Sequence, residues 1–130
     1  MCIRDRYYII LNYAHIFVTE IRLMNIDNAK QQMKKGVLEL CVLSILHRAE
    51  AYPSDIIQEL HKARILVVEG TLYPLLTRLK NSGLLQYRWE ESGSGPPRKY
   101  YKLTADGETY FAALTEAWNE LAGLVSKAIN

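Results

Sequence analysis

A helix with one apolar face, followed directly by a β-hairpin, is the feature that most constrains the fold of this chain. In residues 68–79 (VEGTLYPLLTRL) the apolar side chains recur at i, i+3, i+4 and i+7, which is the spacing of one buried helical stripe. These side chains are Leu72, Leu75, Leu76 and Leu79. We expect Thr71 to cap the helix and Pro74 to lie in its first turn, with Gly83 ending it. The sequence therefore predicts a helix over residues 70–82 that packs on a core through one face.

Two segments with a period of two follow this helix. In residues 85–90 apolar and polar side chains alternate, and residues 98–103 show the same period. The residues between them, 92–97 (SGSGPP), have the composition of a loop. Alternation on both sides of a short loop predicts a β-hairpin. Tyr101 and Leu103 are expected in the core, and the placement of Tyr100 stays open.

The polar face of the helix and the hairpin both carry side chains suited to DNA. Tyr73, Thr77 and Lys80 repeat at i, i+4 and i+7 opposite the leucines, and Arg78 and Asn81 flank them. Hydroxyl, amide and cationic groups on such a face can reach phosphates and base edges in a major groove. The predicted wing contacts are Arg98, Lys99 and Lys102. A helix followed by a basic hairpin is the order of a winged helix-turn-helix, so the sequence predicts a DNA-binding protein.

Plainer interpretations of the same side chains remain open. The polar helix face would also suit simple solvation, and charges on a hairpin often protect a strand edge against aggregation. A winged helix can also serve contacts with other proteins. Such a module has no need for basic side chains on the hairpin together with hydrogen-bonding side chains on the helix over residues 70–82.

Three more helical segments are expected before the helix over residues 70–82. Residues 24–35 are polar and are expected to form a leading helical arm. After a glycine, residues 37–48 are mostly apolar and predict a short helix that is buried on most sides. Pro53 begins the next predicted helix, over residues 53–63. Residues 65–68 are rich in β-branched side chains and predict a small first strand.

A long amphipathic helix is predicted at the C-terminal end of the sequence. Thr104 is expected to cap it, and its helical periodicity continues to about residue 128. Apolar side chains spaced alternately by three and four residues form a heptad seam. The predicted dimer interface on this seam consists of Phe111, Leu114, Trp118, Leu121 and Val125. Because the apolar stripe is broad, we expect one side of it to pack on its own domain and another on a partner.

Residues 1–23 differ in character from the rest of the chain. They begin with charged residues and continue with an aromatic and apolar run at residues 7–18. They could be a secretory signal, although no small-x-small cleavage site follows, or an additional strand or helix. They could also be translated sequence upstream of a natural start at Met24, since MCIRDR resembles a hexapeptide that recurs at the ends of reading frames assembled from short reads. The last interpretation is preferred, so residues 1–23 are predicted to be a non-native or peripheral extension.

Composition and motifs exclude several other classes of protein. The chain has 130 residues, the size of one domain, and a net charge of only +2, so the case for DNA depends on where the charges lie. His15, His47 and His61 have no metal-ligand spacing with each other or with the cysteines, and neither a phosphate-binding glycine motif nor a nucleophile elbow occurs. We therefore expect no enzyme, metal or cofactor. No apolar run is long enough for a membrane span, and the two cysteines, Cys2 and Cys41, fit a reducing cytoplasm.

From residue 24 onward the chain resembles the PadR family of bacterial transcriptional regulators, in the short subclass with one C-terminal helix. The resemblance is carried by EGTLYPLLTRL (residues 69–79), by the glycine that follows, and by GPPRKYYKLT (residues 95–104). It implies a homodimer that binds an inverted-repeat operator in double-stranded DNA and usually represses nearby genes. It also implies that Thr71 joins Tyr73 and its neighbours on or near the DNA-facing side of the recognition helix.

The expected fold class is mainly α (α+β). The expected architecture is a winged helix-turn-helix domain over residues 24–104, with the β-hairpin as its wing. A long C-terminal dimerisation helix over residues 105–130 follows. Some members of the family bind flat aromatic ligands on tryptophans at the place of Trp118. The resemblance therefore allows a small aromatic effector at Trp118, although packing in the dimer interface explains a tryptophan on the seam without any ligand.

Overall fold

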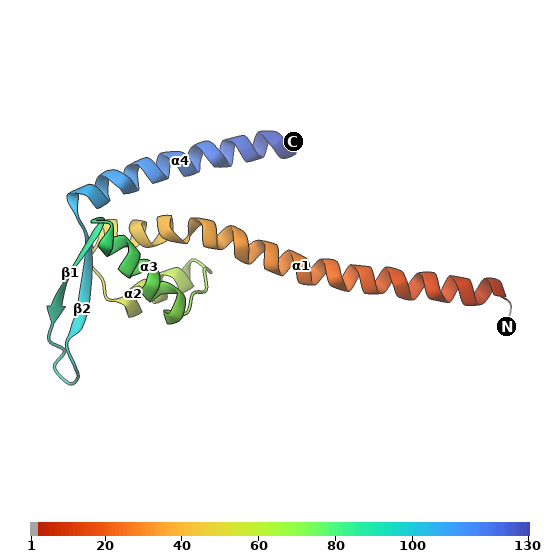
Figure 1. The fold of residues 1–130 in the computed structure, drawn as a ribbon, viewed down its shortest axis with the longest axis horizontal. Coiled ribbons are helices and arrows are strands. Elements are labelled where there is room, and N and C mark those ends of the chain that lie inside the picture. Colours follow the sequence, from red (N-terminus) through yellow and green to blue (C-terminus); the bar gives the residue numbers. More distant parts are fainter. Residues whose placement is uncertain (1–2) are drawn as a thin grey trace. The chain divides into compact units, whose positions relative to one another are not determined.

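The computed structural model describes the backbone of residues 3–130 and the side chains of residues 25–130. Its elements follow the order α-α-α-β-β-α (Figure 1). They are α1 (Ile3–Arg48), α2 (Pro53–Lys62), α3 (Glu69–Asn81), β1 (Leu85–Glu90), β2 (Arg98–Leu103) and α4 (Ala105–Ile129). Cys2 and the side chains of residues 7–18, including His15, lie outside this description, so the expectations about them are unaffected.

Helix α1 is continuous from Ile3 to Arg48, so the predicted arm and the predicted buried helix are one element. The chain divides into two compact units, Met1–Gly36 and Val37–Asn130, and α1 begins in one unit and ends in the other. Gly36 does not interrupt the helix, because a glycine inside a helix costs only about 0.5–1 kcal/mol relative to alanine. In the first unit, the described side chains from residue 25 onward are nearly all exposed.

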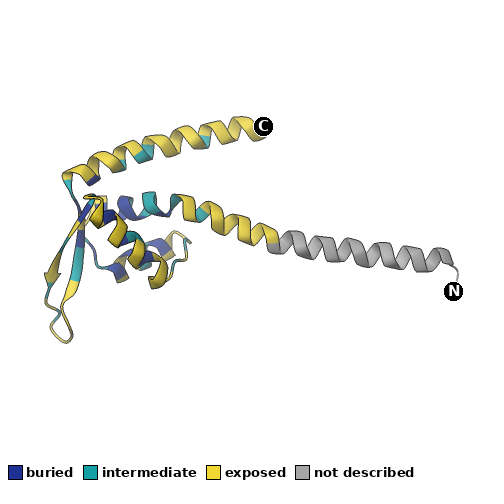
Figure 2. Cartoon of the chain, in the orientation of Figure 1, coloured by how far each residue is buried: buried dark blue, intermediate teal, exposed yellow. Residues whose placement is uncertain are grey.

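The hydrophobic core lies in the second unit and draws on every element there. Figure 2 shows the buried residues on the last turns of α1, on α2 and α3 and in the hairpin, whereas most of α4 is exposed. The largest side chains with almost no exposed surface are Val42, Leu43, Ile56, Leu60, Leu72, Leu76 and Leu79. The predicted leucine stripe of α3 is therefore buried as expected, with Leu75 half-buried at its edge.

Helix α2 begins at Pro53, as predicted, and ends in a left-handed turn. Arg64 has a φ of 61°. Its amide donates to the His61 carbonyl at 2.9 Å, and the Ile65 amide donates to the Leu60 carbonyl at 2.8 Å. This pair of hydrogen bonds is the Schellman motif, which satisfies carbonyl groups at a helix end. The turn sends the chain from α2 towards α3.

The strand predicted at residues 65–68 does not form, and that prediction was wrong. The hairpin instead pairs with Ala51, whose amide and carbonyl exchange hydrogen bonds of 3.1 and 2.9 Å with Tyr101. The β-branched residues of the connector serve packing, since Ile65 and Val67 are half-buried against the core. Strand propensity reports how well side chains pack as much as which backbone groups pair.

Helix α3 begins earlier than the sequence indicated. Val68 occupies the N-cap position and makes no side-chain cap, so Thr71 is the third helical residue rather than the cap. Pro74 consequently lies inside the helix and not in its first turn. It lacks the N–H that would have reached the Gly70 carbonyl. The predicted end at Gly83 is confirmed, because its φ of 80° is one that glycine adopts without strain.

The hairpin is confirmed, with β1 and β2 antiparallel in a register that pairs Leu85 with Leu103 and Glu90 with Arg98. Tyr101 and Leu103 are buried, as expected. Tyr100, whose placement was open, is half-buried on the opposite face of the hairpin, where its ring lies 4.7 Å from that of Tyr52.

Thr104 joins the start of α4 to the end of α3. Its hydroxyl donates to the Gly83 carbonyl at 2.6 Å and accepts from the Gly107 amide at 3.0 Å, so the predicted cap is confirmed. The Thr104 amide donates to the Leu84 carbonyl at 3.1 Å. Gly107 lies so close to this carbonyl that an added Cβ would overlap the Leu84 oxygen. The first turn of α4 is therefore seated on the turn between α3 and β1.

Substitution of Gly107 by alanine tests this close contact. We expect Gly107→Ala to lower the free energy of unfolding by about 1–3 kcal/mol, because the added methyl group forces backbone atoms apart. Gly123→Ala in the same helix is the control, since a Cβ there meets nothing within 4 Å and alanine favours helix by about 1 kcal/mol. Urea unfolding measures the free energy of unfolding of both variants. Equal stability of the two would contradict the close contact.

Candidate nucleic-acid interface

The polar face of α3 is exposed along its whole length. Leu72, Leu76 and Leu79 are buried, which fixes the orientation of the helix on the core. Every residue predicted for DNA on this helix is therefore turned towards solvent. These residues are Thr71, Tyr73, Thr77, Arg78, Lys80 and Asn81. A shallow hollow along the face is lined by Tyr73 and Thr77 in the middle of the helix and by Asn81 at its end.

Arg78 differs from the other predicted contacts because its charge is already paired. Its guanidinium lies 3.3 Å from the carboxylate of Glu39 on α1. Both side chains retain contact with water, so the pair contributes little to stability. Burial, followed by the neighbouring Glu39 carboxylate, raises the pKa of the Tyr110 phenol on α4. Arg78 thus stands at a junction of α1, α3 and α4.

Lys80 of α3 and Lys99 of the hairpin both place their ammonium groups near one aromatic ring. The Lys80 ammonium lies 5.6 Å from the centre of the Tyr87 ring, and the Lys99 ammonium lies 4.6 Å from it. These distances are within reach of cation–π attraction. Tyr87 therefore lies near both a predicted recognition-helix contact and a predicted wing contact.

The other two predicted wing residues belong to the opposite face of the hairpin. The register places Arg98 opposite Glu90 and Lys102 opposite Gln86, one position away from the residues that face the core. On this face the Arg98 guanidinium lies 5.5 Å from the centre of the Tyr52 ring. The register thus puts Lys99 on one face of the hairpin and Arg98 and Lys102 on the other, although Arg98 and Lys99 both line a cleft beside α3.

Acidic residues neutralise part of this opposite face. Arg88 lies 3.3 Å from both the Glu50 and the Glu90 carboxylates. The Tyr52 hydroxyl donates to Glu90 at 3.2 Å. Burial, followed by this carboxylate, raises the pKa of Tyr52. The network attaches the hairpin to the chain before α2 and pairs the charge of Arg88.

A cleft separates α3 from the hairpin. One wall carries Tyr73 and Thr77 of α3, and the other carries Trp89 and Lys99, with the start of α2 at one end; the volume is about 480 Å³. Trp89 was not among the residues predicted from sequence to contact DNA; it shares a period of two with Leu85 and Tyr87. It is 62% exposed, since the hairpin extends beyond the core at this position. Its place at the loop end of the strand is the signal that could have found it.

The predicted seam of α4 divides into two parts. Phe111 and Leu114 are half-buried and pack against the core of their own domain. Trp118, Leu121 and Val125 are exposed, as are other apolar residues nearby (Figure 2). These further residues are Tyr110, Leu124 and Ile129.

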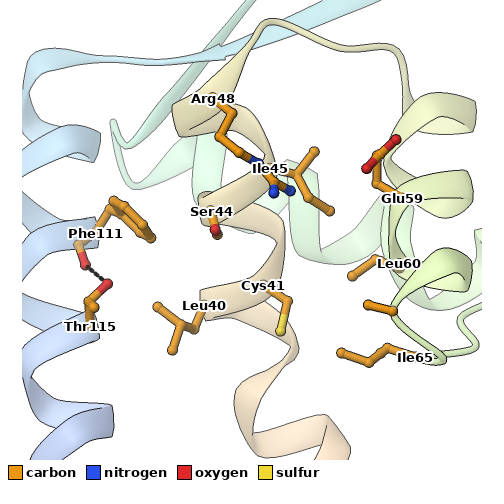
Figure 3. Close-up of a pocket in the computed structure, with 11 residues that line it drawn as sticks. Leu40, Cys41, Ser44, Ile45, Arg48, Glu59, Leu60, Ile65, Phe111 and Thr115 are labelled. Atoms are coloured by element: carbon orange, nitrogen blue, oxygen red, sulfur yellow. Dashed lines mark hydrogen bonds between the residues drawn. The ribbon is translucent and has the colours of Figure 1, made fainter.

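A second cavity, of about 340 Å³, lies between α1, α2 and α4 (Figure 3). Cys41 lines it beside Leu40 and Ser44, and Arg48 and Glu59 stand at one end. Burial raises the pKa of the Cys41 thiol, which lowers its nucleophilicity by keeping it protonated. Within the described residues no group of histidine, cysteine and acidic side chains could hold a metal ion. None of the described helices combines the length and apolar content needed to cross a bilayer.

Comparison with known proteins places the chain among regulators. The family model described as "Transcriptional regulator PadR-like family" matches residues 42–113. The chain belongs to this family. Members of the PadR-like family are transcriptional regulators and not enzymes, in agreement with the sequence.

Solved structures support this assignment and the winged-helix fold. A PadR-like transcription factor from Bacteroides fragilis is 59% identical, with a TM-score of 0.66 over 77% of this chain and 97% of that chain. A PadR family transcriptional regulator from Eggerthella lenta is 31% identical, with a TM-score of 0.72 over 92% and 97%. Bacillus subtilis PadR in complex with operator DNA is 23% identical, with a TM-score of 0.57 over 61% and 46%, and this likeness concerns the fold.

The buried tyrosine beneath this surface predicts how stability depends on pH. Burial, followed by the neighbouring Tyr87 and Tyr73, raises the pKa of Tyr101. The folded state therefore favours the neutral phenol, and its contribution is present below the unfolded pKa of about 10 and lost as pH rises through the folded pKa. We expect the free energy of unfolding to fall above about pH 10 and to fall less steeply in Tyr101→Phe. Urea unfolding over this pH range measures both slopes, and identical slopes would contradict the assignment.

Proposed function

We propose that the chain is a sequence-specific DNA-binding transcriptional regulator in which α3 enters the major groove and the hairpin acts as the wing. The observation that carries this proposal is the exposed polar face of α3, together with the cleft that it forms with Trp89 and Lys99 of the hairpin. Tyr73 and Thr77 supply hydrogen-bonding groups at its centre. Lys80 and Lys99 supply positive charge at one side, where both approach the Tyr87 ring.

The charge arrangement on this surface favours an anion as its ligand. Lys80 and Lys99 each place an ammonium group near the Tyr87 ring, and each can bind a phosphate of a DNA strand. The opposite face of the hairpin, by contrast, carries Glu50 and Glu90 beside Arg88. We therefore assign the principal phosphate contacts to Lys80 and Lys99, with Arg98 and Lys102 in a secondary role. Regulation of this kind takes place in the cytoplasm, where bacterial DNA lies.

We also propose that the protein acts as a homodimer through α4. Trp118, Leu121 and Val125 form an exposed apolar stripe on this helix, and large exposed apolar patches commonly mark interaction sites. A two-fold dimer places two recognition helices about 34–36 Å apart on successive major grooves. The operator would then be an inverted repeat, and a dimer bound near a promoter would repress by excluding RNA polymerase. In this assignment residues 24–104 bind DNA, residues 105–130 dimerise, and residues 1–23 serve neither purpose.

Binding to DNA is tested first by selection from a randomised duplex pool at two salt concentrations. We expect recovery of one inverted-repeat sequence, bound with an affinity that falls steeply as salt increases because phosphate contacts release counterions. Recovery of no sequence, together with a stoichiometric protein partner, would favour the alternative of a winged helix used for protein contacts.

The recognition helix is tested with the double variant Tyr73→Ala, Lys80→Ala. We expect the affinity for the selected duplex to fall at least tenfold, since a good base-reading contact contributes about 1–3 kcal/mol. The melting temperature should hardly change, because both side chains are exposed. Gln58→Ala, exposed on α2, is the control. Unchanged affinity in a folded double variant would mean that the polar face of α3 is only solvated and does not contact DNA.

The dimer is tested by placing a charge on the stripe. We expect Leu121→Glu to shift the protein from dimer to monomer, because burying an unpaired carboxylate at an interface is unfavourable. Asn119→Glu adds the same charge to the same helix beside the seam and is the matched control. Sedimentation equilibrium measures the state of each variant. A Leu121→Glu protein that remains dimeric would remove this stripe from the interface.

Two roles are considered for Trp118 at such an interface: packing against the second copy and binding a small effector. We propose that it packs against the second copy, since aromatic side chains bury large apolar areas at interfaces. A small aromatic effector that releases the protein from DNA is the other role, and it would act by changing the angle between the two protomers. Saturable quenching of tryptophan fluorescence by planar aromatic compounds at low concentration, with a matching loss of DNA affinity, would assign that effector site.

A further inference from the structure

Trp89 is exposed on a face of the hairpin whose other residues are buried or half-buried. The residues that share this face nearer to α4 are Leu85 and Tyr87 on β1 and Tyr101 and Leu103 on β2. Trp89 lies 62% exposed at the loop end of the same face. Packing on this chain's own core therefore does not account for the indole ring.

The indole is nevertheless held in place. Its ring meets the Tyr87 ring edge-on, with centres 6.0 Å apart and an interplanar angle of 86°. Lys99, its partner in the strand register, places its ammonium 4.6 Å from the centre of the Tyr87 ring and 5.5 Å from that of Trp89. An aromatic side chain fixed by such neighbours loses little conformational entropy when a ligand covers it.

Trp89 also lines the cleft towards the recognition helix. Tyr73 and Thr77 form the facing wall, and Pro97 and Lys99 continue the hairpin side. A ligand that lies along the polar face of α3 and enters this cleft meets an apolar ring beside an ammonium group. Deoxyribose and phosphate, which alternate along a DNA strand, offer the matching pair of surfaces.

We propose that Trp89 is a DNA-contacting residue of the wing, packing its indole against deoxyribose while Lys99 binds the neighbouring phosphate. The inference rests on the proposed function and extends it, because the sequence assigned only basic side chains to the wing. The two residues act through different forces. Lys99 contributes a contact that salt weakens, whereas the contact of Trp89 is apolar and independent of salt.

This difference gives a measurement that separates the two roles. With the selected duplex, we expect Trp89→Ala to lower affinity roughly 10- to 100-fold, the effect of burying a large apolar side chain, without changing the log–log slope against salt. Lys99→Gln should flatten that slope by about 0.9. Trp89→Phe should keep most of the affinity, because it retains an aromatic ring. If the alanine variant does not fold, Trp89→Gln, which also removes the ring, should show the loss. Gln86→Ala, on the opposite face of β1, is the control.

Fluorine NMR of the full chain labelled with 5-fluorotryptophan observes the contact directly. The chain has two tryptophans, so two signals are expected, and Trp89→Phe identifies one of them. The Trp89 signal should shift when the duplex is added. Bound duplex with an unmoved Trp89 signal and unchanged affinity in Trp89→Ala would overturn the inference while leaving the proposed function intact. Absence of any duplex binding by the unsubstituted protein would overturn both.

Discussion

The hydroxyl group of Thr104 holds the two functional parts of the second unit together. It donates to the Gly83 carbonyl at the end of α3 and accepts from the Gly107 amide in the first turn of α4. One side chain thereby satisfies polar groups at the ends of two helices, which would otherwise lack partners. The absence of a side chain at Gly107 lets α4 approach the Leu84 carbonyl closely enough for this geometry. The direction in which α4 leaves the core follows from these contacts.

This junction directly connects α3, which carries the surface proposed for DNA, to α4, which carries the stripe proposed for dimerisation. The Arg78–Glu39 pair and the hydrogen-bonded pair of His47 and Glu108, 2.6 Å apart, add contacts among α1, α3 and α4. Phe111 packs on the core and stacks near the His47 ring, with centres 4.8 Å apart. A change in how α4 meets a second copy would therefore act on the recognition helix through a few short contacts rather than through a flexible linker.

The sequence predicted those elements whose signals are local. The leucine period of α3, the alternation of the hairpin and the caps at Gly83 and Thr104 all depend on neighbouring residues, and the structure confirms them. The start of α3 was misplaced although its signal is local, because Val68 and not Thr71 takes the N-cap position. The other failures depend on distant partners. Ala51 takes the strand position expected for residues 65–68, because backbone pairing is decided by the fold and not by β-branching. The division of the wing into a Lys99 face and an Arg98 face, and the exposure of Trp89, likewise required the register and the extent of the core.

Because α4 begins at a fixed position on Thr104, the number of residues along α4 determines the direction in which each of its side chains points. Each residue of an α-helix turns the chain by roughly 100°, so the number of residues between Thr104 and Trp118 sets the direction in which the exposed stripe points relative to α3. Regulators that share the cap but differ in this spacing would present their recognition helices in different relative orientations. In the proposed dimer, the length of this stretch of α4 would therefore contribute to the geometry of the operator.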